Sequence, residues 1–385
     1  MKTLLFALLA LASAHVYFRE DFSNADWQSR WVVSDWKQDS GEAGKWDLSA
    51  GKYFTDETKE RGLRTTQDAR FYDISAAHEE FSNKDKNLYI QFSVKHEQNI
   101  DCGGGYVKLV PADALTDQKN FQGGASETKY NVMFGPDVCG YTKKVHFILN
   151  HKGTNHLIKE EIPFDNDEFT HVYTGALFPD NTFKVWVDGV EKKSGSIPDN
   201  WDLLPPKKIN DPAQSKPADW VDEKMIVDPE DKKPEGYDDI PEEIADPDAK
   251  KPEDWDDDLD GDWEAPKVPN PDYKGPWSPR KIDNPLYKGP WIHPQIDNPD
   301  YKYDAELYQY SSFKYVGIDI WQVKSGSIFS HFLLTDDWET AKAEIDAIGV
   351  IRENEKKLKE VADKAAAEKA AAEKPQEPVE EKEDL

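Results

Sequence analysis

The chain has 385 residues, with 76 acidic against 48 basic side chains and a formal net charge of −28. A surface this acidic disfavours nucleic acid as a partner, because phosphates need basic side chains, and it suits cations, basic partners or solubility. Thirteen Trp, 16 Tyr and 17 Phe are too many for a disordered acidic chain, so part of the protein must fold around an aromatic-rich core.

The first 14 residues, MKTLLFALLALASA, combine one Lys, a short apolar run and small residues at a cleavage position. This pattern predicts a signal peptide over residues 1–14. No later segment is long enough to span a bilayer, so we expect a soluble protein of the secretory pathway.

Residues 15–203 carry short strand signals separated by Gly, Asn, Asp and Pro. Asn87–Lys95 and Lys144–Asn150 alternate between apolar and polar residues, and Thr182–Val187 is followed by Asp188-Gly189, a hairpin signal. Many short strands with frequent turns, and no convincing amphipathic helix, predict an antiparallel β-sandwich.

The chain has two cysteines, Cys102 and Cys139. In an oxidising compartment such a pair most often forms a disulfide, which is worth roughly 3–4 kcal/mol in the chain-entropy model. Two thiols without a nearby His-x-x-His disfavour a metal site, and the missing Cys-x-x-Cys excludes a thioredoxin-like redox site.

Residues 204–302 are rich in Pro and poor in aliphatic side chains, and they contain three repeats of one type followed by three of another. This order predicts a hairpin-like arm in which each outgoing unit pairs with a returning unit, folding back near residues 256–262. Pro restricts the unfolded arm and Trp covers apolar surface. A disordered linker is the alternative. The repeats are marked by Asp-Pro pairs at Asp211, Asp228 and Asp246, and then by Trp263, Trp277 and Trp291.

Strand signals return after the arm, at Lys314–Val323 and Gly326–Leu334. Residues 303–336 are therefore expected to complete the sandwich, which makes the arm an insertion. Residues 337–374 are rich in Ala, Glu and Lys and predict a C-terminal helix. Residues 375–385 predict a disordered acidic tail, whose final Lys-Glu-Asp-Leu resembles the retrieval signal Lys-Asp-Glu-Leu of the endoplasmic reticulum with its two acidic residues exchanged. Retrieval to that compartment, and secretion or display at the cell surface, both remain open.

Two residue pairs indicate a sugar site. Tyr106 and Lys108 follow a Cys-Gly-Gly-Gly run, and Asp319 and Trp321 have the same spacing, so each pair shares one face of a strand. Hydroxyl, carboxylate and aromatic groups suit a carbohydrate, although such pairs are common and a purely structural role remains open. No motif of nucleophilic or metal-dependent catalysis occurs, so we expect no enzyme activity.

Several segments resemble the calreticulin family. KHEQNIDCGGGYVKL (Lys95–Leu109), YNVMFGPDVCG (Tyr130–Gly140) and IDIWQVKSGSIF (Ile318–Phe329) are similar to its lectin segments, and the NPDYKGPW units are similar to its proline-rich arm. The resemblance extends from about Val16 to about Leu334. It implies a legume-lectin-like β-sandwich (jelly roll) with an inserted extended proline-rich hairpin arm and a C-terminal α-helix. Membrane-bound calnexins fit less well, because no membrane span is expected.

The resemblance also implies function. It indicates a monomeric, lumenal calcium-binding lectin chaperone of the endoplasmic reticulum that binds monoglucosylated high-mannose N-glycans on unfolded glycoproteins. The Cys102–Cys139 disulfide would belong to the lectin site. The implied carbohydrate-binding residues are Tyr106, Lys108, Tyr130, Met133, Asp137, Ile148, Asp319 and Trp321.

A disulfide-isomerase-family oxidoreductase is the implied partner of the arm tip. The Asp-rich tip resembles the start of an EF-hand, but Lys267 occupies the twelfth position, which excludes that motif and leaves loose Ca²⁺ binding as an alternative. The implied tip residues are Trp255, Asp258, Asp260, Asp262 and Trp263.

Calcium is the implied cofactor. The structural Ca²⁺ site would use the backbone carbonyls of Asp21, Lys59 and Arg61 and a carboxylate where this chain has Ser330, a loss that weakens a hard-cation site. The mixed Lys, Ala and Glu tail predicts reduced calcium storage. The alternative functions are a glycan-independent polypeptide-binding chaperone or secreted surface protein, a Ca²⁺ buffer, and a glycosidase built on two carboxylates.

Overall fold

The computed structural model describes residues 14–255 and 261–372. Residues 1–13 of the predicted signal peptide, Asp258 and Asp260 of the arm tip, and the tail with its terminal Lys-Glu-Asp-Leu lie outside the described residues. Contacts divide the described chain into two units, one formed by residues 14–206 and 300–372 and the other by residues 207–299.

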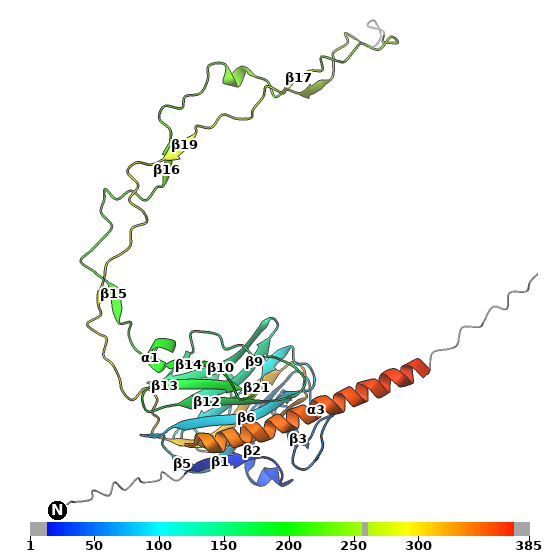
Figure 1. Cartoon of the computed structure of the whole chain (residues 1–385), viewed down its shortest axis with the longest axis vertical. Coiled ribbons are helices and arrows are strands. Elements are labelled where there is room, and N and C mark those ends of the chain that lie inside the picture. Colours follow the sequence, from blue (N-terminus) through cyan, green and yellow to red (C-terminus); the bar gives the residue numbers. More distant parts are fainter. Residues whose placement is uncertain (1–13, 256–260, 373–385) are drawn as a thin grey trace, which may run out of the picture. The chain divides into compact units, whose positions relative to one another are not determined.

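The first unit consists of two eight-stranded sheets in which all paired strands are antiparallel (Figure 1). The order of the first sheet is β14-β13-β12-β6-β22-β4-β3, with β1 also paired to β22. Its strands are β1 (Val16–Glu20), β3 (Trp46–Ser49), β4 (Gly62–Thr65), β6 (Leu88–His96), β12 (Thr170–Leu177), β13 (Thr182–Val187), β14 (Val190–Ser196) and β22 (Ser327–Thr335).

The order of the second sheet is β11-β10-β9-β7-β21-β5-β2, with β8 paired to both β9 and β21. The mostly β, antiparallel lectin-like sandwich predicted from the sequence is thereby confirmed. The strands of this sheet are β2 (Trp31–Val33), β5 (Arg70–Phe81), β7 (Cys102–Gly104), β8 (Val107–Val110), β9 (Val132–Cys139), β10 (Thr142–His151), β11 (Thr154–Leu157) and β21 (Phe313–Gln322).

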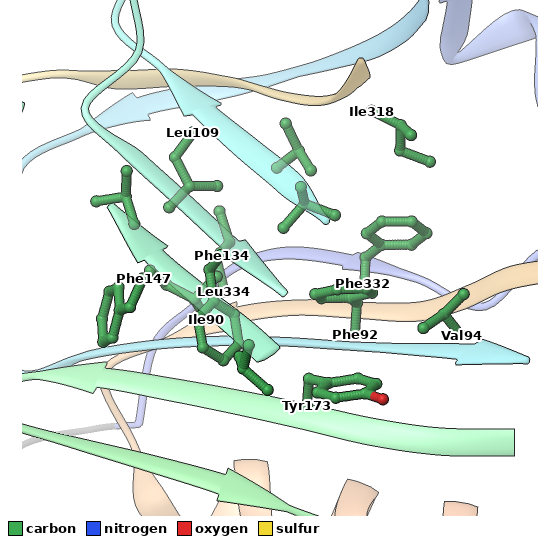
Figure 2. Close-up of a cluster of buried hydrophobic side chains, with 14 of the residues drawn as sticks. Ile90, Phe92, Val94, Leu109, Phe134, Phe147, Tyr173, Ile318, Phe332 and Leu334 are labelled. Atoms are coloured by element: carbon green, nitrogen blue, oxygen red, sulfur yellow. The ribbon is translucent and has the colours of Figure 1, made fainter. Parts of the chain in front are cut away.

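Aromatic and aliphatic side chains fill the space between the two sheets (Figure 2). The Phe92 ring of β6 has its centroid 6.4 Å from that of Phe134 of β9, and 6.0 Å from those of both Tyr173 of β12 and Phe332 of β22. All four side chains are fully buried. Burying one large apolar side chain contributes about 1.5–3 kcal/mol, so this shared aromatic and aliphatic core stabilises the sandwich.

A long C-terminal helix covers the outer face of the first sheet. Gln91 and Lys95 of β6 alternate with the core residues, yet both are buried. The reason is that helix α3 packs over them. Gln91 Nε2 donates to the Ala341 carbonyl (3.1 Å), and Lys95 Nζ pairs with Glu355 (2.8 Å), which also accepts from the backbone N–H and the hydroxyl of Thr170 (both 2.7 Å). Glu355 is therefore the polar anchor of the helix.

The predicted C-terminal helix is confirmed as α3. Among the residues described, no helix has the length and apolar character that a membrane crossing requires. The helices are α1 (Ile197–Asn200) and α3 (Trp338–Ala372), and the 3-10 turns are η1 (Trp27–Ser29), η2 (Gln118–Asn120), η3 (Gly124–Ser126) and η4 (Tyr237–Asp239).

The second unit contains three short antiparallel ladders, β15 with β20, β16 with β19 and β17 with β18 (Figure 1). The first outgoing strand pairs with the last returning strand, which is the pairing that the repeat order predicts. Each ladder has an aliphatic pair at its centre: Ile209 with Ile296, Ile226 with Ile282 and Ile244 with Val268. The strands are β15 (Lys208–Asn210), β16 (Met225–Val227), β17 (Glu243–Ala245), β18 (Lys267–Pro269), β19 (Lys281–Asp283) and β20 (Gln295–Asp297).

Side chains bond across the two legs of this unit between the ladders. The Trp220 indole N–H donates to the Gly289 carbonyl (2.8 Å), and the Asn284 amide donates to the Glu223 carbonyl (3.0 Å). Such bonds satisfy backbone groups that three-residue ladders leave unpaired. The repeated Trp therefore connects the legs as well as covering apolar surface.

Candidate functional site

All eight predicted carbohydrate-binding residues belong to the second sheet or to the segments that lead directly into its strands. The register places Lys108 of β8 opposite both Met133 of β9 and Gly317 of β21, and Met133 opposite Ile148 of β10. Residues at paired positions share one face of a sheet, so residues far apart in the chain meet on that face. Tyr106 precedes β8, Tyr130 precedes β9, Asp137 lies in β9, and Asp319 and Trp321 lie in β21.

Lys108 is the electrostatic centre of this face. Its amine pairs with Asp319 and with Glu127, and it lies 5.0 Å from the centroid of the Tyr130 ring. Burial, and next the negative charge of Glu127, raise the pKa of Tyr130, so that hydroxyl stays protonated. The centre thus combines carboxylate acceptors with hydroxyl and ammonium donors, which are the groups that sugar hydroxyls need.

The loop between β8 and β9, residues 111–131, packs over this centre. Phe121 is fully buried and belongs to a hydrophobic cluster with Tyr130, Met133 and Ile148. A Cβ added to Gly317 would lie 2.4 Å from the Phe121 ring, so that glycine is what makes room for it. The loop is therefore anchored on the sheet by apolar packing.

Burial separates the eight residues into two groups. Trp321 is 38% exposed, and Tyr106 and Asp137 are partly exposed. The other five are less than 9% exposed: Lys108, Tyr130, Met133, Ile148 and Asp319. A Cβ added to Gly123 would lie 2.4 Å from Asp319 Oδ1, which shows how closely the loop covers that carboxylate.

Aromatic rings continue outward from Trp321. The centroid of Trp321 lies 4.7 Å from that of Phe71, which lies 4.9 Å from that of Trp36. On another side, the Tyr106 ring packs edge-on at 6.0 Å against His146, whose Nε2 lies 3.4 Å from Asp137. These partly exposed groups offer apolar rings beside a carboxylate, a combination that suits the C–H face and the hydroxyls of a sugar.

The two cysteines are directly opposite each other in the β7–β9 pair. The register brings their sulfur atoms to 2.7 Å from each other. The disulfide itself stays a prediction. Gly103 and Gly104 follow in β7, and a Cβ on Gly104 would lie 2.5 Å from the Tyr106 ring, so the glycine run lets that ring lie close to the strand.

Sequence reasoning missed two acidic residues of this face, Glu127 and Asp73. Glu127 belongs to an irregular loop, where spacing predicts no partner. Asp73 lies in β5 directly opposite Asp319, and strand alternation marks only that it shares a face with Phe71 and Ser75. The strand pairing, which the sequence alone does not provide, was the missing information.

Hydrogen bonds within the protein occupy the place implied for structural Ca²⁺. The Ser330 hydroxyl donates to two carbonyls, those of Asp21 (3.2 Å) and Arg61 (3.0 Å). The Arg61 guanidinium donates to the carbonyls of Phe22 (2.7 Å) and Ser23 (2.6 Å). Two of the three implied carbonyls, those of Asp21 and Arg61, therefore already accept a hydrogen bond from the protein.

The chemistry of this donor set does not fit a resident Ca²⁺. A neutral hydroxyl replaces the carboxylate, and Lys59, the third implied carbonyl residue, brings an ammonium paired with Asp56 (3.1 Å). Among the described residues, no three or more His, Cys, Asp or Glu side chains form a group able to hold a metal ion. Ca²⁺ prefers six to eight oxygen ligands, several of them carboxylates.

The arm tip is described in part. The Trp255 indole N–H donates to the Gly261 carbonyl (2.8 Å), which bonds the two legs on either side of residues 256–260. Trp255 and Trp263 are partly exposed and Asp262 is exposed. The described tip residues therefore combine aromatic surface with negative charge.

Comparisons with known proteins agree with this architecture. Residues 18–261 and 259–334 match the model of the calreticulin family. The chain is 54% identical over 359 residues to the calreticulin of Entamoeba histolytica, covering 92% of this chain and 90% of that one. It is 53% identical over 366 residues to the calreticulin of Caenorhabditis elegans, covering 94% and 90%.

A solved structure extends the likeness to three dimensions. The globular domain of T. cruzi calreticulin superposes with a TM-score of 0.64 at 31% identity, covering 91% of this chain and 100% of that one. The shared core is the two-sheet sandwich that carries the Lys108 centre.

Proposed function

Because the chain belongs to the calreticulin family, whose members are calcium-binding chaperone lectins rather than enzymes, we propose that it binds monoglucosylated high-mannose N-glycans on unfolded glycoproteins in the lumen of the endoplasmic reticulum. The observation that carries the proposal is the buried Lys108–Asp319 pair beside the exposed Trp321 on one sheet face. Charged groups would hold sugar hydroxyls while the indole covers a C–H face.

Calorimetric titration with a monoglucosylated high-mannose oligosaccharide tests this proposal. Trp321→Ala should weaken binding at least roughly tenfold, the equivalent of about 1.4 kcal/mol. Tyr141→Ala is the matched control, because Tyr141 is fully exposed in the turn between β9 and β10 of the same sheet, and it should bind as the wild type does. Absence of binding by the wild type at millimolar oligosaccharide would disprove the proposal.

A glycan-independent chaperone is the second candidate function. It is favoured by the burial of five of the eight predicted contact residues beneath residues 111–131, since a covered centre contributes less to a ligand. This function predicts that suppression of aggregation of an unglycosylated client is unchanged in Trp321→Ala. Strong glycan binding that disappears in the same variant would exclude it as the main activity.

The arm would serve a partner of the disulfide-isomerase type. The supporting observations are the partly exposed Trp255 and Trp263 and the exposed Asp262 at its described tip. Titration of the full chain with such an oxidoreductase should show binding that Trp263→Ala weakens. Asp272→Asn, an exposed residue in the loop after β18, is the control outside the tip.

Calcium binding would come from the acidic surface rather than from the Ser330 site. A net charge of −28 concentrates cations around the chain without fixed ligands. Equilibrium dialysis should therefore find weak, salt-sensitive binding of several Ca²⁺ ions. One tightly held ion would contradict this assignment.

A further inference from the structure

Asp73 of β5 lies beside Asp319 of β21 in the interior of the candidate site. The two residues are directly opposite each other in the antiparallel strand pair, so their carboxyl groups are neighbours on one face of the sheet. They are 5% and 6% exposed. Asp73 Oδ1 is buried without a hydrogen-bond partner.

One ammonium, that of Lys108, cannot balance three ionised carboxylates, those of Asp73, Asp319 and Glu127. Lys108 already pairs with Asp319 and Glu127. On the other side of β5, the backbone N–H of Ser34, which follows β2, donates to the Asp73 carbonyl (3.0 Å), and Val32 of β2 lies opposite Ser75 on the same face. Both side chains are neutral. Among the described residues, the ionisable groups that act on Asp73 are Asp319 and Lys108. An ionised Asp73 would add a third negative charge around one ammonium and leave a charged oxygen unpaired, which is costly in a buried site.

A neutral Asp73 removes this conflict. Burial, and next the charge of Asp319 and the hydrogen bond to it, raise the pKa of Asp73 to about 9, against the opposing effect of Lys108. At neutral pH the side chain is therefore a carboxylic acid with an O–H to donate.

We infer that Asp73 is a positioning residue of the carbohydrate site, whose carboxylic acid donates a hydrogen bond to Asp319 and fixes the orientation of that carboxylate toward the sugar. The inference rests on the proposed function, in which Asp319 accepts from a sugar hydroxyl. Lys108 pairs with Asp319 Oδ2, and the backbone at Gly123 limits the space around Oδ1. A hydrogen bond from Asp73 would be the third contact that orients the Asp319 carboxylate.

The pH dependence follows from the protonation of Asp73. As pH rises through about 9, the O–H donor is lost and a second negative charge appears beside Asp319. Both changes release Asp319 from its orientation and make it compete with Asp73 for Lys108. Glycan affinity should therefore be constant around neutral pH and fall above that value.

Titration calorimetry of the full chain with the monoglucosylated oligosaccharide, at pH 7 and near pH 10, tests the inference. Asp73→Asn keeps the shape and an N–H donor but cannot ionise, so it should bind like the wild type at pH 7. Asp73→Ala removes the donor and should bind roughly tenfold more weakly. Between the two pH values, the wild type should lose affinity severalfold more than Asp73→Asn, whose remaining change measures the titration of all other groups. Thermal unfolding at both pH values confirms that each variant is folded.

The outcomes separate this inference from the function on which it rests. If the wild type binds, and Asp73→Ala binds equally well or Asp73→Asn shows the same alkaline loss as the wild type, the positioning role is wrong and the proposed function stands. If the wild type does not bind at either pH, both are overturned. If Asp73→Ala is unfolded, the comparison of Asp73→Asn with the wild type across pH still decides.

Discussion

The sandwich and the arm are built by different physical means. In the sandwich, residues from distant strands fill one shared interior, as Phe92, Phe134 and Tyr173 do. In residues 207–299, three-residue ladders and single side-chain bonds such as Trp220 to Gly289 recur with the sequence repeats. The comparison teaches that cooperative stability needs a common core, whereas an extended unit can be ordered by local bonds repeated along its length.

Removing a side chain from the shared interior should have the largest effect on the free energy of unfolding. Phe134→Ala removes a fully buried ring and should destabilise the sandwich by about 4 kcal/mol, through lost burial and the cavity left behind. Chemical denaturation followed by near-ultraviolet circular dichroism measures this loss. Tyr141→Ala, in the same sheet but fully exposed, should stay within about 0.5 kcal/mol of the wild type. Equal effects of the two would show that no common core is present.

Substitution of Glu355, the polar anchor of helix α3, should cause the second-largest loss of stability. Glu355→Ala removes the carboxylate 2.8 Å from the buried Lys95 ammonium and leaves it with the Ala50 carbonyl (2.8 Å) and the more distant Glu97 (3.7 Å). The loss should cost about 3 kcal/mol, the low end for a broken buried pair. Hydrogen exchange should locate the loss in α3 and β6. Glu355→Gln, which keeps the shape and can still accept from Thr170, should cost less. A stability unchanged in Glu355→Ala would mean that the helix is held by its apolar face alone.

The third prediction concerns the Ser330 site, where hydrogen bonds from the Ser330 hydroxyl stand in the place implied for a bound Ca²⁺. Chelation of Ca²⁺ should leave the melting temperature of the wild-type sandwich unchanged, because protein donors already bond the Asp21 and Arg61 carbonyls. Ser330→Asp restores a carboxylate, and at a hundredfold excess of Ca²⁺ over Kd it should gain about 2–3 kcal/mol that a chelator removes. Ser330→Asn is the neutral control. A wild-type melting temperature that falls on chelation would contradict the assignment.

The smallest effect belongs to the arm. Trp220→Ala removes one bond between the legs and should loosen its own repeat by about 1 kcal/mol, seen as faster hydrogen exchange near β16 and β19. Trp220→Phe keeps the ring but not the N–H, and so separates the bond from apolar cover. The melting temperature of the sandwich should be unchanged in both. A drop in that temperature would show that the two units unfold together.

The same contrast explains what sequence could predict. Strands such as Leu88–His96 and Thr182–Val187, helix α3 and the leg-to-leg pairing of the arm follow from local periodicity and repeats. The eight resemblance-based site residues were located on one sheet face. Glu127 above Lys108 and Asp73 beside Asp319 were not found, because both roles depend on contacts between segments far apart in the chain. The packing of residues 111–131 over the site was missed for the same reason.

Helix α3 has two physically different parts, a packed N-terminal part and an exposed C-terminal part of residues 361–372. Its 35 residues rise about 52 Å, and contacts with the sandwich continue as far as Lys359, which pairs with Glu168 (3.2 Å). Residues 361–372 are exposed on all sides, so the Ala-Ala-Ala-Glu-Lys turns there depend on intrinsic propensity and on surface pairs such as Lys359 with Asp363 (3.0 Å). At this length an isolated helix is marginal. On warming, these turns should fray gradually and well below the melting of the sheets, giving a sloping helical baseline and an early site for trimming by proteases.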